Sequence, residues 1–300
     1  MLPAFFIVNP HSGKKDIRKL IPLIREHFEA AKIPFEIRLT QGPNDARKTA
    51  SEIASSHPIV VAVGGDGTVN EVLNGIVNTG CILGLLPIGS GNDFSKAAGY
   101  PSDFRDCLNV LSNQRHKFID LGLVSAATDV AKSDQRYFVN SCGVGLDAVV
   151  ANEAGKIPWI RGVMKYTIAA SRVLFRYHPG HSVVTAAEFS SEGKHLLISV
   201  GNGTCSGGGF YLTPDALLDD GVFDVCLAKD VSITEVLKIL PFVFAGKHGR
   251  FKKVSILRTN KLKVISETDL VVHVDGEILG RDLREVNVEL LPRALKLIVP

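Results

Sequence analysis

An aspartate stands among glycines at the end of a strongly apolar run. Residues 60–63 are valine and alanine, residues 64–67 read Gly-Gly-Asp-Gly, and apolar residues then recur at helical spacing. This pattern predicts a strand, a tight loop and the start of a helix. Glycines let backbone amides approach a ligand, and amides at a helix N-terminus favour an anion such as phosphate. A carboxylate beside phosphate needs a cation, so Asp66 is expected near Mg²⁺ of a bound nucleotide.

Two other loops repeat this plan. Apolar residues 5–8 lead into a small, polar loop at 9–13 and then Lys14 and Lys15, whose charges could neutralise phosphate. Apolar residues 82–86 lead into a third loop at 87–94. In an open parallel sheet, ligands gather at the carboxyl ends of strands, so the three loops could converge on one crevice.

Other interpretations of these loops remain open. Each loop alone could be an ordinary strand-to-helix turn, and none has the Walker A spacing. A dinucleotide-binding fold is disfavoured because Asn70 stands where the third glycine of its fingerprint would be. The strand at 35–39 ends at Thr40, which can hydrogen-bond a nucleotide but supplies no ribose-binding carboxylate.

The motifs along the chain together resemble the catalytic domain of the bacterial diacylglycerol kinase family, and sphingosine and ceramide kinases are similar. GGDGT alone is less specific, because NAD kinases and phosphofructokinases have similar loops. The resemblance covers nearly the whole chain through the following motifs: Asn9-Pro10 with Ser12-Gly13, GGDGTVNEV (64–72), GSGNDF (89–94), NSCGVGLD (140–147), GNGTCSGGG (201–209), PDALLDDGVFD (214–224) and Asp275-Gly276-Glu277.

The resemblance implies an ATP site with Mg²⁺, in which Asp66 is also catalytic. Family members commonly have threonine where this chain has Ser90, so the hydroxyl is retained. The residues expected to line the ATP site are Asn9, Pro10, His11, Ser12, Gly13, Thr40, Gly65, Asp66, Gly67, Thr68, Val69, Asn70, Glu71 and Ser90.

The resemblance also implies that Glu277 is the general base that takes the proton from the lipid hydroxyl. A carboxylate can accept that proton as the O–P bond forms, while positioning and Mg²⁺ supply most of the acceleration. From the residues alone, a β-hairpin is the simpler interpretation. Apolar residues flank Asp275-Gly276, which is a typical two-residue turn.

A second, structural Mg²⁺ is implied in the segment 217–222. Asp220 would provide a side-chain oxygen, and Leu217 and Val222 would provide backbone carbonyls. An Asp-Gly turn between apolar runs explains the same residues without a metal.

The chain changes character near residue 117. Before it, strands alternate with helical segments, which predicts an α/β domain with a parallel sheet. After it, short β-rich runs, among them 262–265 and 271–274 as separate strands, predict a β-sandwich-like domain with one inserted helix at 158–177. We expect an ATP-binding catalytic domain at 1–118, joined by about 283–300 as the resemblance suggests, and a lipid-substrate domain at 119–282.

Composition excludes several classes of protein. The chain has 300 residues and 45% hydrophobic content, enough for two domains with cores, and its net charge of +3 is too small to argue for nucleic acid. Five cysteines, an odd number without CxxC spacing, indicate buried thiols in a reducing cytosol. The apolar stretch at 2–8 is interpreted as a strand rather than a leader, and no run is typical of a transmembrane helix. A two-fold homodimer is the default assembly.

Two basic surfaces could meet a membrane. In the expected helix at 158–177, four basic residues fall within a narrow arc beside three aromatic residues, and a second basic run follows residues 242–244. A solvated helix face is the alternative. The residues are Arg161, Lys165, Arg172 and Arg176 with Trp159, Tyr166 and Phe175, and Lys247, Arg250, Lys252 and Lys253 in the second run.

We therefore expect a cytoplasmic, ATP-dependent lipid kinase acting peripherally at the inner membrane face. Diacylglycerol is the leading acceptor, with phosphatidic acid as product. Alternatives are a kinase for phosphatidylglycerol, a sphingosine-type lipid or NAD, and a non-catalytic nucleotide-sensing module. Residues 89–94 and the late Asp-Gly-Glu triplet favour the lipid kinases over NAD kinase.

Overall fold

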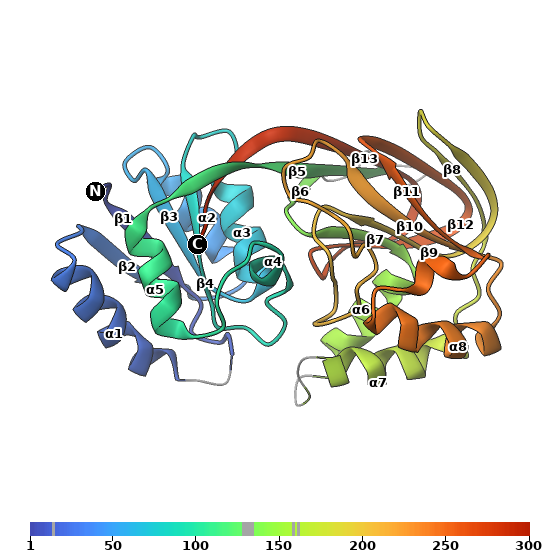
Figure 1. The fold of residues 1–300 in the computed structure, drawn as a ribbon, viewed down its shortest axis with the longest axis horizontal. Coiled ribbons are helices and arrows are strands. Elements are labelled where there is room, and N and C mark those ends of the chain that lie inside the picture. The colour runs from blue at the N-terminus through green and yellow to red at the C-terminus, as the bar shows by residue number, and fades with distance from the viewer. Residues whose placement is uncertain (14–15, 128–134, 158–159, 161–162) are drawn as a thin grey trace. The chain divides into compact units, whose positions relative to one another are not determined.

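The chain divides into two compact units in a computed structural model (Figure 1). The structure describes residues 1–13, 16–127, 135–157, 160 and 163–300. The first unit is Met1–Asp120 with Pro292–Pro300, and the second is Leu121–Leu291.

The first unit alternates strands and helices, as the sequence predicts. Its elements in chain order are β1 (Ala4–Val8), α1 (Ile17–Ala30), β2 (Phe35–Leu39), α2 (Asp45–Ile53), β3 (Ile59–Gly64), α3 (Asp66–Ile76), β4 (Ile82–Pro87), α4 (Asp93–Ala97), α5 (Phe104–Asn113) and the first part of β5 (His116–Ala127).

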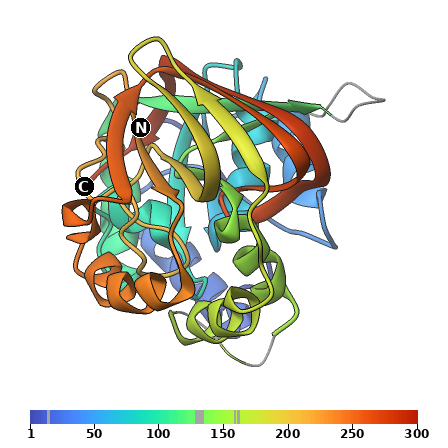
Figure 2. The same cartoon turned by 90° about the vertical axis from the view of Figure 1, so that its right-hand side faces the viewer.

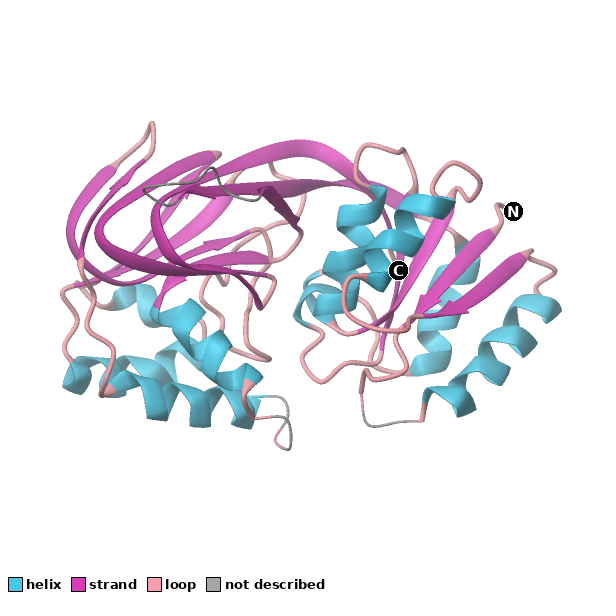
Figure 3. Cartoon of the chain, turned by 180° about the vertical axis from the view of Figure 1, so that it is seen from behind, coloured by secondary structure: helices cyan, strands magenta, loops and turns pink. Residues whose placement is uncertain are grey.

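Strands of the first unit pair in parallel in the order β2-β1-β3-β4. Lys296 and Leu297, near the end of the chain, add to β4 in the same direction. Helices α1 and α5 cover one face of this sheet, and α2 and α3 cover the other (Figures 1 and 3). This arrangement follows from right-handed crossovers that run in opposite directions from β1. The point where the direction reverses lies between β1 and β3, which is where open α/β sheets bind ligands.

Burial of apolar residues holds the first unit together. Every residue of β1 and β3 is buried, as expected of strands covered on both faces. Asp16 is the N-cap of helix α1, and its carboxylate accepts a hydrogen bond from the Arg18 amide. The helix buries a stripe of apolar residues that ends at Phe28. The Phe28 ring packs edge to face on Phe6 with a centroid distance of 4.9 Å.

The second unit is built on antiparallel strands, with helices α6, α7 and α8 beside them (Figure 1). Its elements in chain order are the rest of β5, β6 (Gln135–Phe138), β7 (Ser141–Gly145), α6 (Leu146–Gly155), α7 (Val163–Leu174), β8 (His181–Thr185), β9 (Ser190–Gly201), β10 (Phe223–Lys229), α8 (Ile233–Phe244), the short 3₁₀ turn η1 (His248–Arg250), β11 (Val254–Thr259), β12 (Lys261–Val274) and β13 (Glu277–Ile298).

Long strands organise the second unit. The strand order is β11-β10-β9-β7-β12-β13, and β8 also pairs with both β9 and β12. Strands β7 and β8 therefore lie end to end between β9 and β12. Figure 2 shows the strong curvature of the orange and red strands β12 and β13. The curvature encloses a core of aliphatic residues with Phe138 stacked on Phe223 at 5.6 Å.

Three expectations for the second unit need correction. The runs 262–265 and 271–274 are not separate strands but parts of β12, whose pairing with β13 is irregular between Ile265 and Leu270. Besides the expected helix, the structure contains α6 and α8, so the expectation of a single inserted helix is wrong. The expected helix at 158–177 is described as α7 over 163–174, and residues 158–159 and 161–162 lie outside the described residues.

Helix α8 has a recognisable start. Ser232 and Glu235 form a capping box, in which each side chain satisfies the other residue's backbone amide. Pro241 lies inside the helix and obscures its pattern in the sequence. Within the described ranges, no helix combines the length and apolar character needed to cross a bilayer.

Candidate active site

The predicted loops at 9–13, the first loop along the chain, and at 64–67, the second, meet at the point between β1 and β3. The side-chain amide nitrogen of Asn9 donates a hydrogen bond to Thr68 Oγ1 at 3.1 Å, and the backbone N–H of Asn9 donates to Val63 O at 3.0 Å. The Asn9 Oδ1 accepts a hydrogen bond from the His11 backbone at 3.0 Å. Asn9 therefore fixes the course of the first loop, through Pro10 towards Ser12, against the first turn of α3.

The third loop touches the other two through backbone atoms. A Cβ added at Gly13 would lie 2.0 Å from Ile88 O, and one added at Gly89 would lie 2.5 Å from the Gly65 Cα. Side chains at these positions would separate the loops, which is why glycine is needed there. The convergence predicted from the sequence is thus present within the first unit.

A Gly13→Ala variant is expected to disturb this contact. Gly13 has φ +78°, so alanine would be strained as well as in collision with Ile88. We expect KM for ATP to rise about tenfold and the melting temperature to fall by a few degrees. Gly42→Ala is the matched control, because nothing lies within 4 Å of its added Cβ. Equal kinetics of the two variants would contradict a nucleotide-binding role of the first loop.

The start of α3 offers backbone amides and a carboxylate together. Gly65 is the N-cap without a side-chain hydrogen bond, and Val69 is the first residue whose amide bonds back to Gly65 O. The amides of the first turn, including that of Gly67, have no partner within the helix, as at the start of any helix. Asp66 lies in this turn and accepts a hydrogen bond from the Phe94 amide at 3.4 Å. This end of the helix can hold an anion, with a carboxylate beside it for a cation.

The other residues expected at the ATP site either follow strands of the sheet or lie in α3. Thr40 and Ser90 follow the carboxyl ends of β2 and β4, with Thr40 buried and Ser90 exposed. Val69 and Asn70 are buried within the unit. Both oxygens of Glu71 accept hydrogen bonds from the amides at the start of α2, at 3.0 and 3.1 Å. The Glu71 carboxylate thus caps helix α2, a role that the sequence did not predict.

Glu277 is exposed at the first position of β13, directly after a two-residue turn. Val274 pairs with Glu277 across this turn, and Asp275 and Gly276 both have positive φ, 49° and 87°. The turn is therefore the primed hairpin that the Asp-Gly pair predicts.

The buried Asp275 carboxylate anchors the hairpin turn. It accepts hydrogen bonds from three successive amides, those of Val139, Asn140 and Ser141, at 3.0 to 3.2 Å. Two motifs far apart in the sequence, NSCGVGLD and Asp-Gly-Glu, are joined by this carboxylate. This role of Asp275 was not predicted from the sequence, where the only sign of it is an acidic residue in a turn directly after an apolar run.

A second buried contact lies behind the same turn. His273 Nε2 lies 3.1 Å from Asp147 Oδ2, and the Gly276 amide donates to His273 Nδ1 at 3.2 Å. Burial disfavours the charged imidazole, but Asp147, Asp275 and Glu277 outweigh it and raise the pKa of His273 above its ordinary value.

The segment expected to hold a structural metal has another partner in the structure. Asp220 Oδ1 accepts a hydrogen bond from the Val222 amide at 3.3 Å, and Asp220 Oδ2 pairs with Arg258. The Leu217 side chain is exposed. Across the described residues, no cluster of three or more histidine, cysteine, aspartate or glutamate side chains could hold a metal ion.

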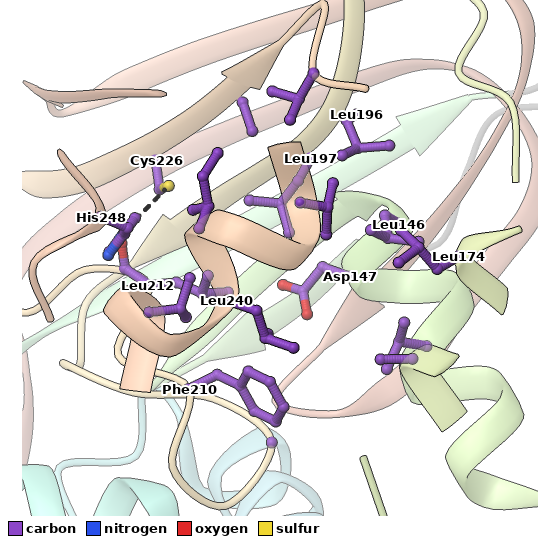
Figure 4. A pocket seen from close by; sticks show the side chains of 18 of the residues that line it. Leu146, Asp147, Leu174, Leu196, Leu197, Phe210, Leu212, Cys226, Leu240 and His248 are labelled. Atoms are coloured by element: carbon purple, nitrogen blue, oxygen red, sulfur yellow. Dashed lines mark hydrogen bonds between the residues drawn. The ribbon is translucent and has the colours of Figure 1, made fainter. Parts of the chain in front are cut away.

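An apolar pocket of about 210 Å³ lies within the second unit, between its helices and the sheet. Figure 4 shows leucine side chains and Phe210 around it, with the Asp147 carboxylate among them. Burial raises the pKa of the Cys226 thiol to about 12 and lowers the pKa of His248, so both remain uncharged at neutral pH. The labelled lining residues are Leu146, Asp147, Leu174, Leu196, Leu197, Phe210, Leu212, Cys226, Leu240 and His248.

The exposed side of α7 carries apolar and basic residues. Met164 is 66% exposed and Phe175, just after the helix, is 63% exposed. Arg172 forms an exposed pair with Glu153 at 3.4 Å. In the second basic surface, the Phe242 ring instead packs under Arg250 at 4.3 Å, so this aromatic residue is engaged within the unit. Trp159 and Arg161 lie outside the described residues.

Comparisons with known proteins agree with this architecture. Residues 3–124 match the diacylglycerol kinase catalytic domain, and residues 140–299 match the YegS C-terminal NAD kinase beta sandwich-like domain. A diacylglycerol kinase of Staphylococcus aureus strain MRSA252 is 30% identical over 285 residues, covering 93% of this chain and 87% of its own. A diacylglycerol kinase of Bacillus subtilis strain 168 is 29% identical over 290 residues, covering 93% and 91%.

Solved structures show the same fold. A diacylglycerol kinase structure from Bacillus anthracis has a TM-score of 0.74 at 22% identity, covering 99% of this chain and 97% of its own. Yeast NADH kinase has a TM-score of 0.58 at 12% identity, covering 100% and 84%.

The α/β unit, the β-sandwich-like unit and the matched motifs together define an ATP-dependent lipid kinase, which phosphorylates an alcohol group. The chain belongs to the diacylglycerol kinase family.

Proposed function

We propose that this protein transfers the γ-phosphate of ATP to the hydroxyl of diacylglycerol, giving phosphatidic acid and ADP. The observation that carries the nucleotide part is the meeting of three glycine-containing loops at the reversal point of a parallel sheet. The names of the relatives in Staphylococcus and Bacillus support diacylglycerol as the acceptor.

We assign the phosphates of ATP to the first unit. Amides of the first turn of α3 would bind phosphate oxygens, and Asn9 with its loop would hold the other side of the nucleotide. Asp66 is suited to hold Mg²⁺, which prefers one or two carboxylates together with substrate phosphates. When bound, the ion neutralises charge on the phosphates.

We assign Glu277 as the general base. The lipid hydroxyl oxygen forms a bond to the γ-phosphorus while the bond from that phosphorus to the ADP oxygen breaks. The hydroxyl proton passes to the Glu277 carboxylate, so charge and atoms balance. The Glu277 carboxylate suits this role, because the turn that precedes it is fixed by Asp275 while its own oxygens stay exposed.

We assign the apolar pocket of the second unit to a hydrocarbon chain of the lipid. Its volume of about 210 Å³ exceeds the roughly 150 Å³ of an apolar cavity that holds benzene. Its lining is mostly aliphatic and uncharged except for Asp147, which would favour an apolar occupant with a polar end.

An Ala170→Phe variant tests this pocket. Ala170 lies in α7 and lines the pocket, so a phenyl ring would fill part of it. We expect kcat/KM for a long-chain diacylglycerol to fall about tenfold, with little change for a short-chain analogue. Ala187→Phe, at an exposed position between β8 and β9, is the control. The same loss with both chain lengths would contradict the assignment.

Three further features belong to this proposal. The exposed Met164 and Phe175 beside Arg172 and Arg176 would let the protein contact an anionic bilayer peripherally. A structural cation near Asp220, with carbonyls of Leu217 and Val222, would share that carboxylate with Arg258. A homodimer stays a proposal, to be tested by sedimentation.

The decisive experiment is a radiolabelled ATP transfer assay with several acceptors in parallel. Diacylglycerol, phosphatidylglycerol, sphingosine and NAD would be offered at equal concentration, the lipids in mixed micelles. Preferential labelling of diacylglycerol supports the proposal, and labelling of another acceptor reassigns the substrate. Nucleotide binding without any transfer would instead indicate a sensing module.

A further inference from the structure

A buried histidine contacts the turn that carries Glu277. His273 is 1% exposed, and its Nδ1 accepts the hydrogen bond from the Gly276 amide at 3.2 Å. Since Nδ1 is an acceptor, a neutral ring must carry its proton on Nε2. That nitrogen lies 3.1 Å from Asp147 Oδ2 without hydrogen-bond geometry, so the negative charge of the carboxylate favours this tautomer.

The space for this pair depends on a glycine in the neighbouring strand. Gly143 of β7 lies opposite His273 in the strand register. A Cβ at Gly143 would lie 2.2 Å from His273 Nε2 and 2.4 Å from Asp147 Oδ2. Gly143 has no positive φ, so its backbone does not require glycine. The glycine is needed because the histidine and aspartate occupy the space beside it.

The two halves of the turn have different supports. Asp275 is tied to the 139–141 segment by its own carboxylate and by its amide, which donates to Ser141 O at 2.8 Å. Gly276, which directly precedes Glu277, is held by the ring of His273. The direction in which the chain leaves the turn towards Glu277 therefore depends on His273.

We propose that His273, oriented by Asp147, is a positioning residue that sets the placement of the Glu277 carboxylate. This inference rests on the proposed role of Glu277 as the base. His273 is enclosed and acts through the Gly276 amide. Asp147 also forms part of the pocket wall (Figure 4), so one carboxylate borders the lipid-chain pocket and orients the histidine beneath the base.

Two substitutions separate the two contacts of the ring. Asparagine can place an oxygen near the position of Nδ1, so His273→Asn keeps an acceptor for Gly276 and loses the N–H that faces Asp147. Glutamine can place its amide nitrogen near the position of Nε2, so His273→Gln keeps an N–H that faces Asp147 and loses the acceptor for Gly276. We expect His273→Gln to lower kcat about tenfold or more with both KM values within about twofold. We expect His273→Asn to keep kcat within roughly threefold of the unsubstituted enzyme.

Thermal unfolding provides the readout that separates positioning from simple stability. His273→Asn leaves the buried Oδ2 atom of Asp147 without the N–H that faces it, so this variant should melt at a lower temperature than His273→Gln. The more active variant should therefore be the less stable one. Gly143→Ala, which crowds the pair without removing it, should also lower kcat. His195→Gln is the control, because His195 is buried in the same unit between Ser182 and Ser191 and does not contact the turn.

The outcomes distinguish this inference from the proposed function. A kcat that follows stability in all variants, or a normal kcat in His273→Gln, overturns the positioning role. The proposed function is tested separately. Transfer of phosphate to diacylglycerol by the unsubstituted protein, together with loss of this transfer in Glu277→Gln, supports it. A Glu277→Gln variant that remains active overturns the base assignment, and with it any role of His273 through Glu277.

Discussion

A Glu277→Gln variant is expected to lose about a thousandfold in kcat for lipid phosphorylation while binding ATP as the unsubstituted enzyme does. The amide has the shape of the carboxylate but cannot accept the hydroxyl proton at neutral pH. Glu277 is exposed at the end of a hairpin whose turn is held by other residues, so the exchange should leave the fold unchanged. Its effect should therefore appear in kcat alone.

Calorimetric ATP titration and steady-state kinetics with diacylglycerol measure these two quantities. Glu289→Gln is the matched control, because Glu289 lies on the same strand and forms only an exposed pair with Lys261 at 3.7 Å. Exposed pairs of this kind contribute little, so this variant should retain full turnover. Normal turnover in Glu277→Gln would remove the glutamate from the mechanism, and loss of ATP binding would assign it a different role.

The loops of the first unit were largely predictable from sequence. Buried parallel strands have continuous apolar runs, and the buried runs here lead into Asn9, Gly64 and Pro87. The sheet order β2-β1-β3-β4 then brings the loops together, which explains the contacts at Gly13 and Gly89. What sequence could not show is that Glu71 points to the start of α2, since this depends on the packing of α2 beside α3.

The second unit was less predictable because its elements depend on long-range contacts. The Asp275-Gly276 hairpin followed from local turn chemistry and is confirmed by the φ values. Helix α6 follows β7 directly and buries small residues such as Ala148 and Ala151, so its amphipathic pattern is weak. For α8, the capping box of Ser232 and Glu235 could have predicted the start of the helix, but the apolar run that follows masked this signal.

The polar contacts beneath the hairpin had no sequence signal. Asp147 and His273 are far apart in the chain and meet only because β7 and β12 pair. The requirement for glycine at Gly143 becomes intelligible only once both side chains are placed beside it. Such buried polar contacts are specified by tertiary structure, because each group must find a partner to offset its desolvation.

An Asp66→Asn variant is expected to lower kcat/KM for MgATP by about a hundredfold or more, which corresponds to several kcal/mol of lost charge stabilisation. Asp66 lies in the first turn of α3, where phosphate and carboxylate would repel each other without a cation between them. The asparagine side chain keeps an oxygen that can accept from the Phe94 amide, so the local structure should persist.

The two charge effects of Asp66→Asn have opposite signs, and this makes the test sharp. With Mg²⁺ present, the variant should need more Mg²⁺ for half-maximal activity, because one ligand has lost its charge. Without divalent cations, the variant should bind ATP more tightly than the unsubstituted protein, because a negative charge beside the phosphates is gone. Asp106→Asn, at an exposed position in α5 of the same unit, should change neither quantity. If metal-free affinity and the Mg²⁺ requirement both stayed the same in Asp66→Asn, the triphosphate would have to bind away from this turn.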